Sequence, residues 1–239
     1  MLGCAVSVLA AGCGGDRLRP TVDITSPAAR THIKGNVVSL DLKALGITIV
    51  KADGDASGST GHFHVFIDKK PVAVGQVIPK APGIVHSAED PVKIYGLTVG
   101  RHTFEVVLGD GTHTRIGSGS KKLTLFVDGP SVHATAPAEV PAGQPVTITV
   151  KVQGVKLVKP DGDRSGKTGH LHVFVDRDPT PVNVPVPKVT DGSIIHTPDP
   201  TVTIPNLAPG EHTLWIVLGD GAHMQFVPPV MDMLIVTVK

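Results

Sequence analysis

The stretch "DGDASGSTGHFHVFID" at residues 53–68 recurs as "DGDRSGKTGHLHVFVD" at residues 161–176, at an offset of 161 − 53 = 108. A second stretch, "GRHTFEVVLGDGTH" at 100–113, recurs as "GEHTLWIVLGDGAH" at 210–223, at an offset of 210 − 100 = 110. A repeat of about 110 residues has the size of a β-sandwich domain. The chain is therefore predicted to contain two homologous domains in tandem.

The composition and the residue patterns predict an all-β fold. The 239 residues include 27 Gly and 21 Pro but only 3% aromatics, which favours short strands joined by many turns. Residues 37–45 and 145–152 alternate apolar and polar side chains as half-buried strands do, and no stretch keeps a helical period. Each repeat is predicted to form an immunoglobulin-like or fibronectin-like sandwich of about seven strands.

The predicted domains meet in "VDGPSVHATAPAEVPAG" at 127–143, which is rich in Pro, Ala and Gly. We expect one β-sandwich over 20–128 and a second over 129–239. Residues 1–19 are expected to be a signal or lipobox segment with a short linker.

The N-terminal segment resembles an export signal. "MLGCAVSVLAAGCGG" carries no charge before Asp16, and its "LAAGC" ends at Cys13 like a bacterial lipobox, whose cysteine is lipidated. The segment is too short to span a membrane. Because no Lys or Arg precedes the apolar run, we expect the true N-terminus to lie upstream; a buried apolar segment is the alternative. Cys4 and Cys13 are the two cysteines of the chain, so the repeats contain neither a disulfide nor a thiolate metal site.

The charge balance argues against a nucleic-acid partner. The 22 Lys and Arg are offset by 21 Asp and Glu, and they form no basic run and no aromatic platform. The repeats also lack a Gly-x-Ser-x-Gly elbow and a nucleophilic cysteine, so no catalytic residue is assigned.

Histidine is the residue type that the repeats share most distinctively. Ten of the 12 histidines are matched between the copies, although the loops around them have diverged. Alternation along "GHFHVFID" places His62 and His64 on one face and the apolar Phe63 and Val65 on the other, with the imidazoles about 6–7 Å apart at Cα. Such a pair becomes a metal site when further ligands arrive from elsewhere in the fold. The predicted ligands are His62, His64, His86 and His113 in the first repeat and His170, His172, His196 and His223 in the second.

Each of these interpretations has an alternative in ordinary structure. The His-x-His pair could lie on a polar strand face in water or in a hydrogen-bonded turn. His102 and His212 are expected to be structural and to bind backbone beside a turn, as a corner tyrosine does. Four carboxylates are candidates for oxygen ligands or for acceptors that orient an imidazole: Asp68, Asp110, Asp176 and Asp220.

A calcium loop is a further candidate. "DGDASG" and "DGDRSG" place Asp at positions 1 and 3, Ser at 5 and Gly at 6 of such a loop. His64 and His172 occupy position 12, where a calcium loop has its bidentate Glu. The pattern therefore favours an Asx-type turn that leads into the strand, with calcium as the alternative.

The order of motifs resembles a known bacterial family. Gly-His-x-His-x-x-x-Asp, a loop histidine, Leu-x-x-Gly-x-His-Thr and Gly-Asp-Gly-x-His resemble the family of domains of unknown function 4399 over nearly all of each repeat, from Leu40 and Ile148 onward. The resemblance implies export and a role for the His-x-His motif, but no activity. The strand also resembles, locally, the copper-binding His-x-His strand of copper-zinc superoxide dismutases.

Together these features predict an exported, lipid-anchored protein of the bacterial cell envelope. It is expected to bind copper, or zinc as the second choice, at one site per domain for buffering, delivery or assembly of another envelope protein. A copper-dependent enzyme similar to superoxide dismutase is one alternative, and it needs an open coordination position. An adhesive or spacer module without metal is another. The expected partners are the membrane, through the anchor, the metal ion and another protein of the envelope.

Overall fold

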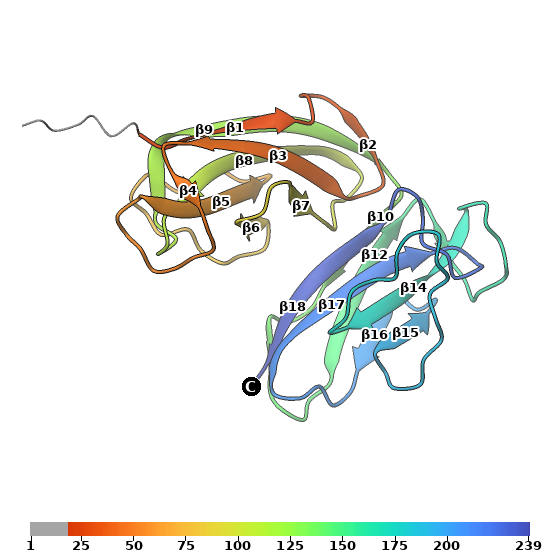
Figure 1. Cartoon of the computed structure of the whole chain (residues 1–239). Coiled ribbons are helices and arrows are strands. Elements are labelled where there is room, and N and C mark those ends of the chain that lie inside the picture. Colours follow the sequence, from red (N-terminus) through yellow and green to blue (C-terminus); the bar gives the residue numbers. More distant parts are fainter. Residues whose placement is uncertain (1–18) are drawn as a thin grey trace, which may run out of the picture.

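The computed structural model describes residues 19–239, so the predicted lipobox and its Cys13 lie outside the described residues. All regular elements of this part of the chain are strands, and they fall into two bodies, β1–β9 and β10–β18 (Figure 1). Among residues 19–239 there is no helix with the length and apolar character that membrane crossing requires. The prediction of two tandem β-sandwiches is confirmed.

The first domain packs a small antiparallel sheet against a larger one. Fully buried Leu40, Val65 and Phe104 meet between the two sheets. The small sheet has the order β1 (Thr21–Ser26), β3 (Val38–Leu45), β7 (Val92–Ile94). The larger sheet has the order β2 (His32–Lys34), β9 (Arg115–Gly129), β8 (Gly100–Gly109), β5 (Thr60–Ile67), β4 (Thr48–Ile49), and β6 (Ile84–Ser87) also pairs with β5.

The second domain repeats this arrangement. Its small sheet has the order β10 (Ser131–Thr135), β12 (Val146–Gln153), β16 (Thr201–Ile204). Its larger sheet has the order β11 (Glu139–Val140), β18 (Met231–Val238), β17 (Gly210–Gly219), β14 (Thr168–Val175), β13 (Lys156–Leu157), and β15 (Ile194–Thr197) pairs with β14. The short strands β2, β4, β11 and β13 pair in parallel, and each domain has seven further strands in antiparallel pairs.

Strand β5 is buried on both faces, and this burial positions the histidines. Phe63 and Val65 point into the sandwich core. Phe66 faces the other way and packs with Ile78 and Val107 in a small cluster under the loop between β5 and β6. The loop therefore covers the outer face of the large sheet, on which the His-x-His pair lies. The same cover exists over β14 in the second domain, where Phe174 packs with Val186 and Val217.

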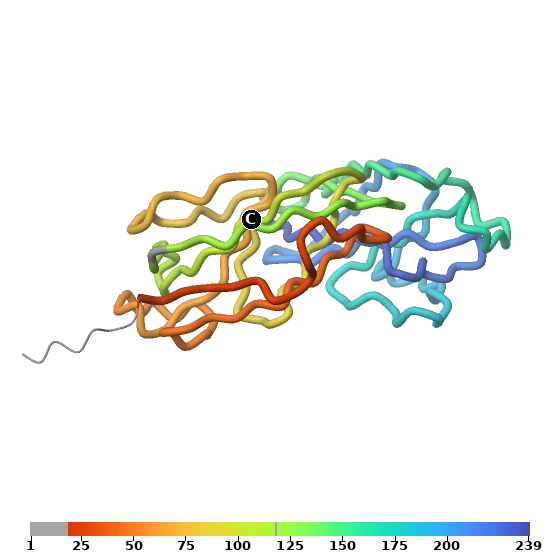
Figure 2. The backbone as a smooth tube through the Cα atoms, turned by 90° about the horizontal axis from the view of Figure 1, so that it is seen from above, coloured from red at the N-terminus to blue at the C-terminus, as the bar shows by residue number. Residues whose placement is uncertain are grey.

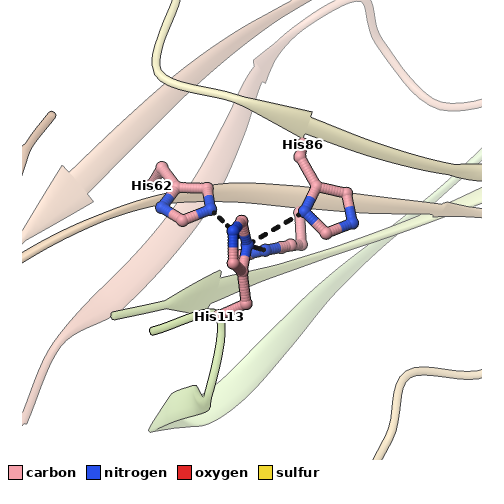
Figure 3. A group of neighbouring side chains, drawn as sticks. His62, His86 and His113 are labelled. Atoms are coloured by element: carbon pink, nitrogen blue, oxygen red, sulfur yellow. Dashed lines mark hydrogen bonds between the residues drawn. The ribbon is translucent and has the colours of Figure 1, made fainter. Parts of the chain in front are cut away.

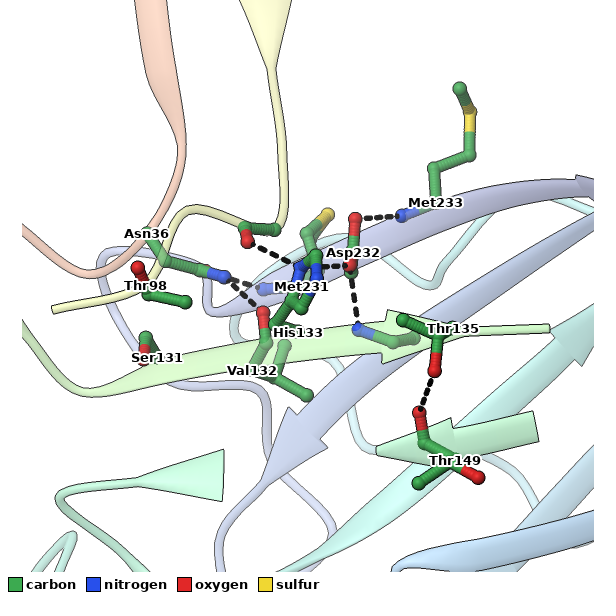
Figure 4. Close-up of polar contacts among 12 residues, drawn as sticks. Asn36, Thr98, Ser131, Val132, His133, Thr135, Thr149, Met231, Asp232 and Met233 are labelled. Carbon is green, nitrogen blue, oxygen red and sulfur yellow. Dashed lines mark hydrogen bonds and ion pairs between the residues drawn. The ribbon is translucent and has the colours of Figure 1, made fainter. Parts of the chain in front are cut away.

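The two domains follow each other almost without a linker. Seen from above they succeed one another along the molecule (Figure 2), and the view of Figure 1 shows that the second domain is set at an angle to the first. Strand β9 ends at Gly129 and β10 begins at Ser131. Asn36 of the first domain is fully buried and donates from Nδ2 to the carbonyl of Val132 at 2.6 Å. Its Oδ1 accepts from the Met231 N–H at 3.0 Å, so one amide side chain binds two strands of the second domain (Figure 4).

Backbone of the first domain also enters this junction. The Gly96 N–H donates to the carbonyl of Met231 at 3.1 Å, and the Gly96 carbonyl lies 2.9 Å from Nδ1 of His133. Asp232 is buried beside them and accepts from the Ala134 N–H at 2.8 Å, with His133 Nδ1 at 3.4 Å (Figure 4). The hydrogen bond to Asp232 raises the pKa of His133, although burial of the ring opposes the shift. The junction is thus specific and polar.

Candidate metal centres

Four histidines converge in each domain, and they are the eight residues predicted from the sequence. In the first cluster, His62 and His64 come from β5, His86 from β6 and His113 from the turn between β8 and β9 (Figure 3). One ring nitrogen of each residue lies within 4.8 Å of those of the other three. The second cluster meets the same criterion and consists of His170, His172, His196 and His223.

Strand register brings the third histidine to the pair. His64 lies directly opposite His86 in the antiparallel β5–β6 pair, and His172 lies opposite His196 in β14–β15. Directly opposed residues of neighbouring strands point to the same side of the sheet. His86 and His196 therefore lie in strands, although the sequence places them in a loop, and their side chains are on the same side of the sheet as the His-x-His pair.

His113 occupies the centre of the first cluster. Its Nδ1 lies 3.0 Å from His62 Nε2, 3.4 Å from His64 Nε2 and 3.1 Å from His86 Nδ1 (Figure 3). A ring nitrogen either donates one proton or accepts at one in-plane lone pair. The single proton or lone pair on His113 Nδ1 can therefore form one well-aligned hydrogen bond, and the other two contacts are left without one. A cation among the four nitrogens could accept a lone pair from every ring at once.

The second cluster shows the same geometry around His223. Its Nδ1 lies 3.1 Å from His170 Nε2, 3.4 Å from His172 Nε2 and 3.1 Å from His196 Nδ1. The agreement with the first cluster is within 0.1 Å for each contact. Both copies of the repeat therefore preserve one arrangement of donors.

A backbone carbonyl determines the tautomer of one ligand in each cluster. His86 Nε2 lies 3.2 Å from the carbonyl of Pro79, and His196 Nε2 lies 3.1 Å from the carbonyl of Pro187. A carbonyl oxygen only accepts, so Nε2 carries the proton in the neutral ring. The lone pair is then on Nδ1, which faces the cluster centre. Metal-binding histidines in proteins are usually oriented by such an outer hydrogen bond.

Burial keeps the His-x-His imidazoles neutral. His64 is fully buried and His62 is 3% exposed. Burial, reinforced by the neighbouring imidazoles, lowers the pKa of His62 to about 4 and that of His64 to about 2. The same causes lower the pKa of His170 to about 4 and that of His172 to about 2. The lone pairs that a metal requires are therefore available at neutral pH, and a polar strand face in water is excluded as the explanation of the motif.

A glycine makes room for the deepest imidazole. A Cβ on Gly109 would lie 2.3 Å from Cε1 of His64, and a Cβ on Gly219 would lie 2.3 Å from Cε1 of His172. No side chain larger than hydrogen fits beside the ring. The first glycine of each "GDG" motif is thus required by the position of the imidazole.

His102 and His212 lie outside the clusters and have a structural role, as expected. His102 Nδ1 is 2.7 Å from Oδ2 of Asp68, and its Nε2 is 2.8 Å from the carbonyl of Thr98. His212 makes the same two contacts, with Asp176 and the Ala208 carbonyl. Of the two roles predicted for Asp68 and Asp176, oxygen ligand or acceptor that orients an imidazole, the structure shows the second, on a histidine outside the clusters.

Asp110 supports the cluster without contacting an imidazole. Its Oδ1 accepts from the N–H groups of Thr112 at 2.9 Å and Thr114 at 3.0 Å, which closes the turn around His113. Asp220 closes the equivalent turn through the N–H groups of Ala222 and Met224, both at 2.9 Å.

The "DGDASG" loop is an Asx-type turn, as the sequence favoured. Asp53 Oδ1 accepts from the Asp55 N–H at 3.0 Å, and Asp55 Oδ1 accepts from the Ser57 N–H at 2.8 Å. Asp55 Oδ2 accepts from the Ser57 hydroxyl at 2.7 Å, and the one proton of the Thr60 hydroxyl lies within reach of Asp53 Oδ2 at 3.2 Å and Asp55 Oδ2 at 3.1 Å. Because donors of the loop and of the first residue of β5 surround these oxygens, the geometry supplies nothing in favour of calcium.

The donor set fits a transition metal. Imidazole nitrogens suit copper, zinc and nickel, whereas calcium and magnesium prefer oxygen. In a tetrahedral site with bonds of about 2.05 Å, two ligand atoms are about 3.3 Å apart. The contacts around His113 Nδ1, at 3.0–3.4 Å, are close to this spacing, and all four donor atoms lie within 4.8 Å of one another. Small rotations of the rings therefore suffice to close either cluster on one ion.

Sequence comparison finds the same domain in both halves of the chain. The domain of unknown function DUF4399 matches residues 38–128 and again residues 138–239. No curated protein matches the sequence.

Among solved structures, the fibronectin(III)-like modules of Clostridium thermocellum CbhA match at 15% identity and a TM-score of 0.28, over 92% of this chain and 94% of that chain. Dimeric latent PorU from Porphyromonas gingivalis matches at 14% identity and a TM-score of 0.30, over 98% and 22% of the two chains. Escherichia coli alpha-2-macroglobulin activated by porcine elastase matches at 10% identity and a TM-score of 0.25, over 92% of this chain and 23% of that chain. At these TM-scores the similarities carry no argument about the site.

Proposed function

The chain belongs to the DUF4399 family, with two copies of the domain in tandem. From the two histidine clusters, we propose that each domain binds one transition-metal ion through four imidazole nitrogens. The observation that carries this proposal is the set of three contacts at 3.0–3.4 Å around a single ring nitrogen, which protons alone cannot satisfy. Copper is the favoured ion and zinc the second, because copper binds nitrogen donors most tightly among the divalent ions of its row.

Binding without catalysis is the favoured role. Four protein ligands complete the coordination of a tetrahedral ion, whereas catalytic sites keep one position open for water or substrate. We therefore favour metal buffering, delivery or assembly of another envelope protein over a reaction similar to that of superoxide dismutase. An enzyme would have to release one imidazole, or expand its coordination to five, before it could bind a substrate at the ion.

The proposed location is the bacterial cell envelope, with the chain anchored by a lipid on Cys13. The "LAAGC" motif supports the anchor. The donor chemistry is consistent with an oxidising compartment, because imidazoles do not undergo the oxidation that inactivates thiolate ligands. The proposed partners are the metal ion, the membrane through the anchor, and another protein of the envelope.

Metal stoichiometry tests the proposal. The full chain with Cys4→Ser and Cys13→Ser, which has no thiol to compete for copper, is loaded with Cu(I), Cu(II) or Zn(II), dialysed and measured by mass spectrometry. We expect one ion per cluster, hence two per chain. The variant His64→Ala/His172→Ala should lose both ions, while the control His32→Ala, at an exposed histidine outside the clusters, should keep them. Failure to retain metal, or retention in the double variant, would refute the proposal.

Anchoring has its own test. The gene is expressed in a bacterium with its natural upstream sequence, and the cell envelope is separated into detergent-soluble and aqueous fractions. We expect the wild-type protein in the detergent phase with a lipid on Cys13, and the Cys13→Ser variant in the aqueous phase. An unmodified Cys13 in a cytoplasmic protein would refute the location.

A further inference from the structure

The turn that carries His113 is held by the duplicated Asp loop, defined here as residues 53–59 in the first domain and 161–167 in the second. The Gly54 N–H donates to the Gly111 carbonyl at 3.0 Å, and the Gly111 N–H donates to the Asp55 carbonyl at 2.9 Å. These two bonds attach the loop to the turn two residues before His113. The second domain repeats both, with Gly162 N–H to the Gly221 carbonyl at 2.9 Å and Gly221 N–H to the Asp163 carbonyl at 2.7 Å.

The Asp loop is itself attached to the strand that carries the other ligands. It continues directly into β5 at Thr60, two residues before His62. The Thr60 hydroxyl lies 3.2 Å from Asp53 Oδ2 and 3.1 Å from Asp55 Oδ2, and its one proton can bond either, which ties the start of the strand to the loop. The loop therefore connects the two elements that supply three of the four imidazoles in the first cluster.

The contact between loop and turn is tight enough to require glycine. A Cβ on Gly111 would lie 2.0 Å from Oδ1 of Asp53 and 2.6 Å from the Asp55 nitrogen, and the same two distances recur at Gly221 with Asp161 and Asp163. Neither Gly111 nor Gly221 has a left-handed φ, so the requirement is for space alone. An added methyl group must push the turn and the loop apart.

We propose that the Asp loop and Gly111 form a clasp that positions His113 for metal binding, and that the second domain uses Gly221 in the same way for His223. The inference rests on the proposed metal-binding function. His113 is held with a left-handed φ of 63° in a turn closed by Asp110. Because its Nδ1 contacts all three other imidazoles, a tilt of this turn changes three contacts at once. The clasp residues act through His113 and do not touch the ion.

A glycine substitution with a matched control tests the clasp. In the full chain with Cys4→Ser and Cys13→Ser, His170→Ala/His172→Ala disables the second cluster so that Cu(II) reports on the first. Gly111→Ala is compared with Gly119→Ala, where an added Cβ would meet nothing within 4 Å. We expect Gly111→Ala to weaken Cu(II) binding about 10- to 100-fold, as loss of an outer-shell contact does. Its electron paramagnetic resonance spectrum should lose one nitrogen ligand, and Gly119→Ala should leave both readouts unchanged.

A second pair of variants separates positioning from general stability. Asp53→Ala removes the acceptor that orders the loop, whereas Asp53→Asn keeps an oxygen for the Asp55 N–H. Asp53→Ala should weaken Cu(II) binding, and Asp53→Asn should restore most of the affinity. If Gly111→Ala and Asp53→Ala lower the melting temperature but leave the affinity and the spectrum unchanged, the residues are merely structural and the clasp proposal is overturned.

A metal-free readout distinguishes failure of the clasp from failure of the function. In the crystal structure of metal-free Gly111→Ala, we expect His113 Nδ1 to have moved away from His62 Nε2. In solution, hydrogen exchange should show that the Gly54 amide proton exchanges faster than in the parent chain. Contacts that stay at 3.0–3.4 Å would overturn the clasp whether or not the wild type binds metal. Absence of Cu(II) binding by the parent chain would instead refute the proposed function.

Discussion

Replacing His64 by leucine should stabilise the metal-free protein. The side chain is fully buried, its Nδ1 has no hydrogen-bond partner in the described residues, and its Nε2 shares the single proton or lone pair of His113 with two other rings. Burying an unsatisfied polar group costs about 1–3 kcal/mol, whereas an apolar group of similar size avoids that penalty. Imperfect packing of leucine beside Gly109 offsets part of the gain. We expect His64→Leu to raise the free energy of unfolding by about 1–2 kcal/mol.

The matched control changes a histidine of the opposite kind. His102 is also buried, but both of its nitrogens have acceptors, Asp68 and the Thr98 carbonyl. His102→Leu leaves those groups without their donor and should lower the free energy of unfolding by about 1–3 kcal/mol.

The assay is urea unfolding in the presence of a chelator, followed by the same titration in free metal. Metal at 100 times its dissociation constant should stabilise the wild-type first domain by about 2.7 kcal/mol and His64→Leu by nothing, so the order of stabilities reverses. A loss of stability in metal-free His64→Leu as large as that in His102→Leu would refute the reasoning, because it would mean that His64 serves the fold.

Three further outcomes are expected. Gly109→Ala places a methyl group 2.3 Å from Cε1 of His64 and should weaken metal binding at the first cluster at least 10-fold, which a competition titration would measure; unchanged affinity would contradict the role of Gly109. Arg164 Nε lies 3.4 Å from Asp220 Oδ2, whereas the matched residue of the first domain is Ala56. Arg164→Ala removes the positive charge that offsets the Asp220 carboxylate, so it should tighten metal binding at the second cluster a few-fold in the same competition titration. Equal affinities of the two proteins would contradict this account. Because the pKa of His133 is raised in the folded chain above its ordinary 6.5, its charged contact with Asp232 stabilises the fold fully below pH 6.5 and loses this contribution as the pH rises through the raised value; urea unfolding should show that His133→Gln removes this part of the pH dependence, and a parallel profile for the two proteins would contradict it.

Most of the fold and the identity of the site residues could be predicted from the alternation of apolar and polar residues and from the internal repeat. The period of two predicted that His62 and His64 share a face, and the matched positions of the two repeats indicated His86 and His113 as their partners. The geometry that makes the cluster depends on long-range structure. The register that sets His64 against His86 follows a loop of divergent sequence, and the Pro79 carbonyl that orients His86 belongs to that loop. Loop conformation and backbone hydrogen bonds have no periodic signal in sequence, so neither feature could be predicted.

The short-range pattern also left the purpose of the aspartates open. Asp at alternate positions of "DGD" suits a calcium loop and an Asx turn equally well, and the choice depends on which donors reach the carboxylates. Asp110 is placed beside His113 by sequence but binds the backbone of its own turn. The sequence signal for these close contacts is the repeated "GDG" before the histidine. Gly109 and Gly111 flank Asp110, and a glycine on each side of one residue indicates close backbone approach on both sides.

The junction between the domains holds the two histidine clusters at a fixed distance from each other. Strands β9 and β10 are separated by a single residue, and Asn36 and Gly96 each bind the second domain by hydrogen bonds. Two ions held in such a body would keep one mutual distance and one relative orientation. Each cluster takes its four imidazoles from its own domain, so loading would follow two independent isotherms. Two paramagnetic Cu(II) ions in this chain would give one sharp dipolar frequency, and Asn36→Ala, by loosening the junction, would broaden it.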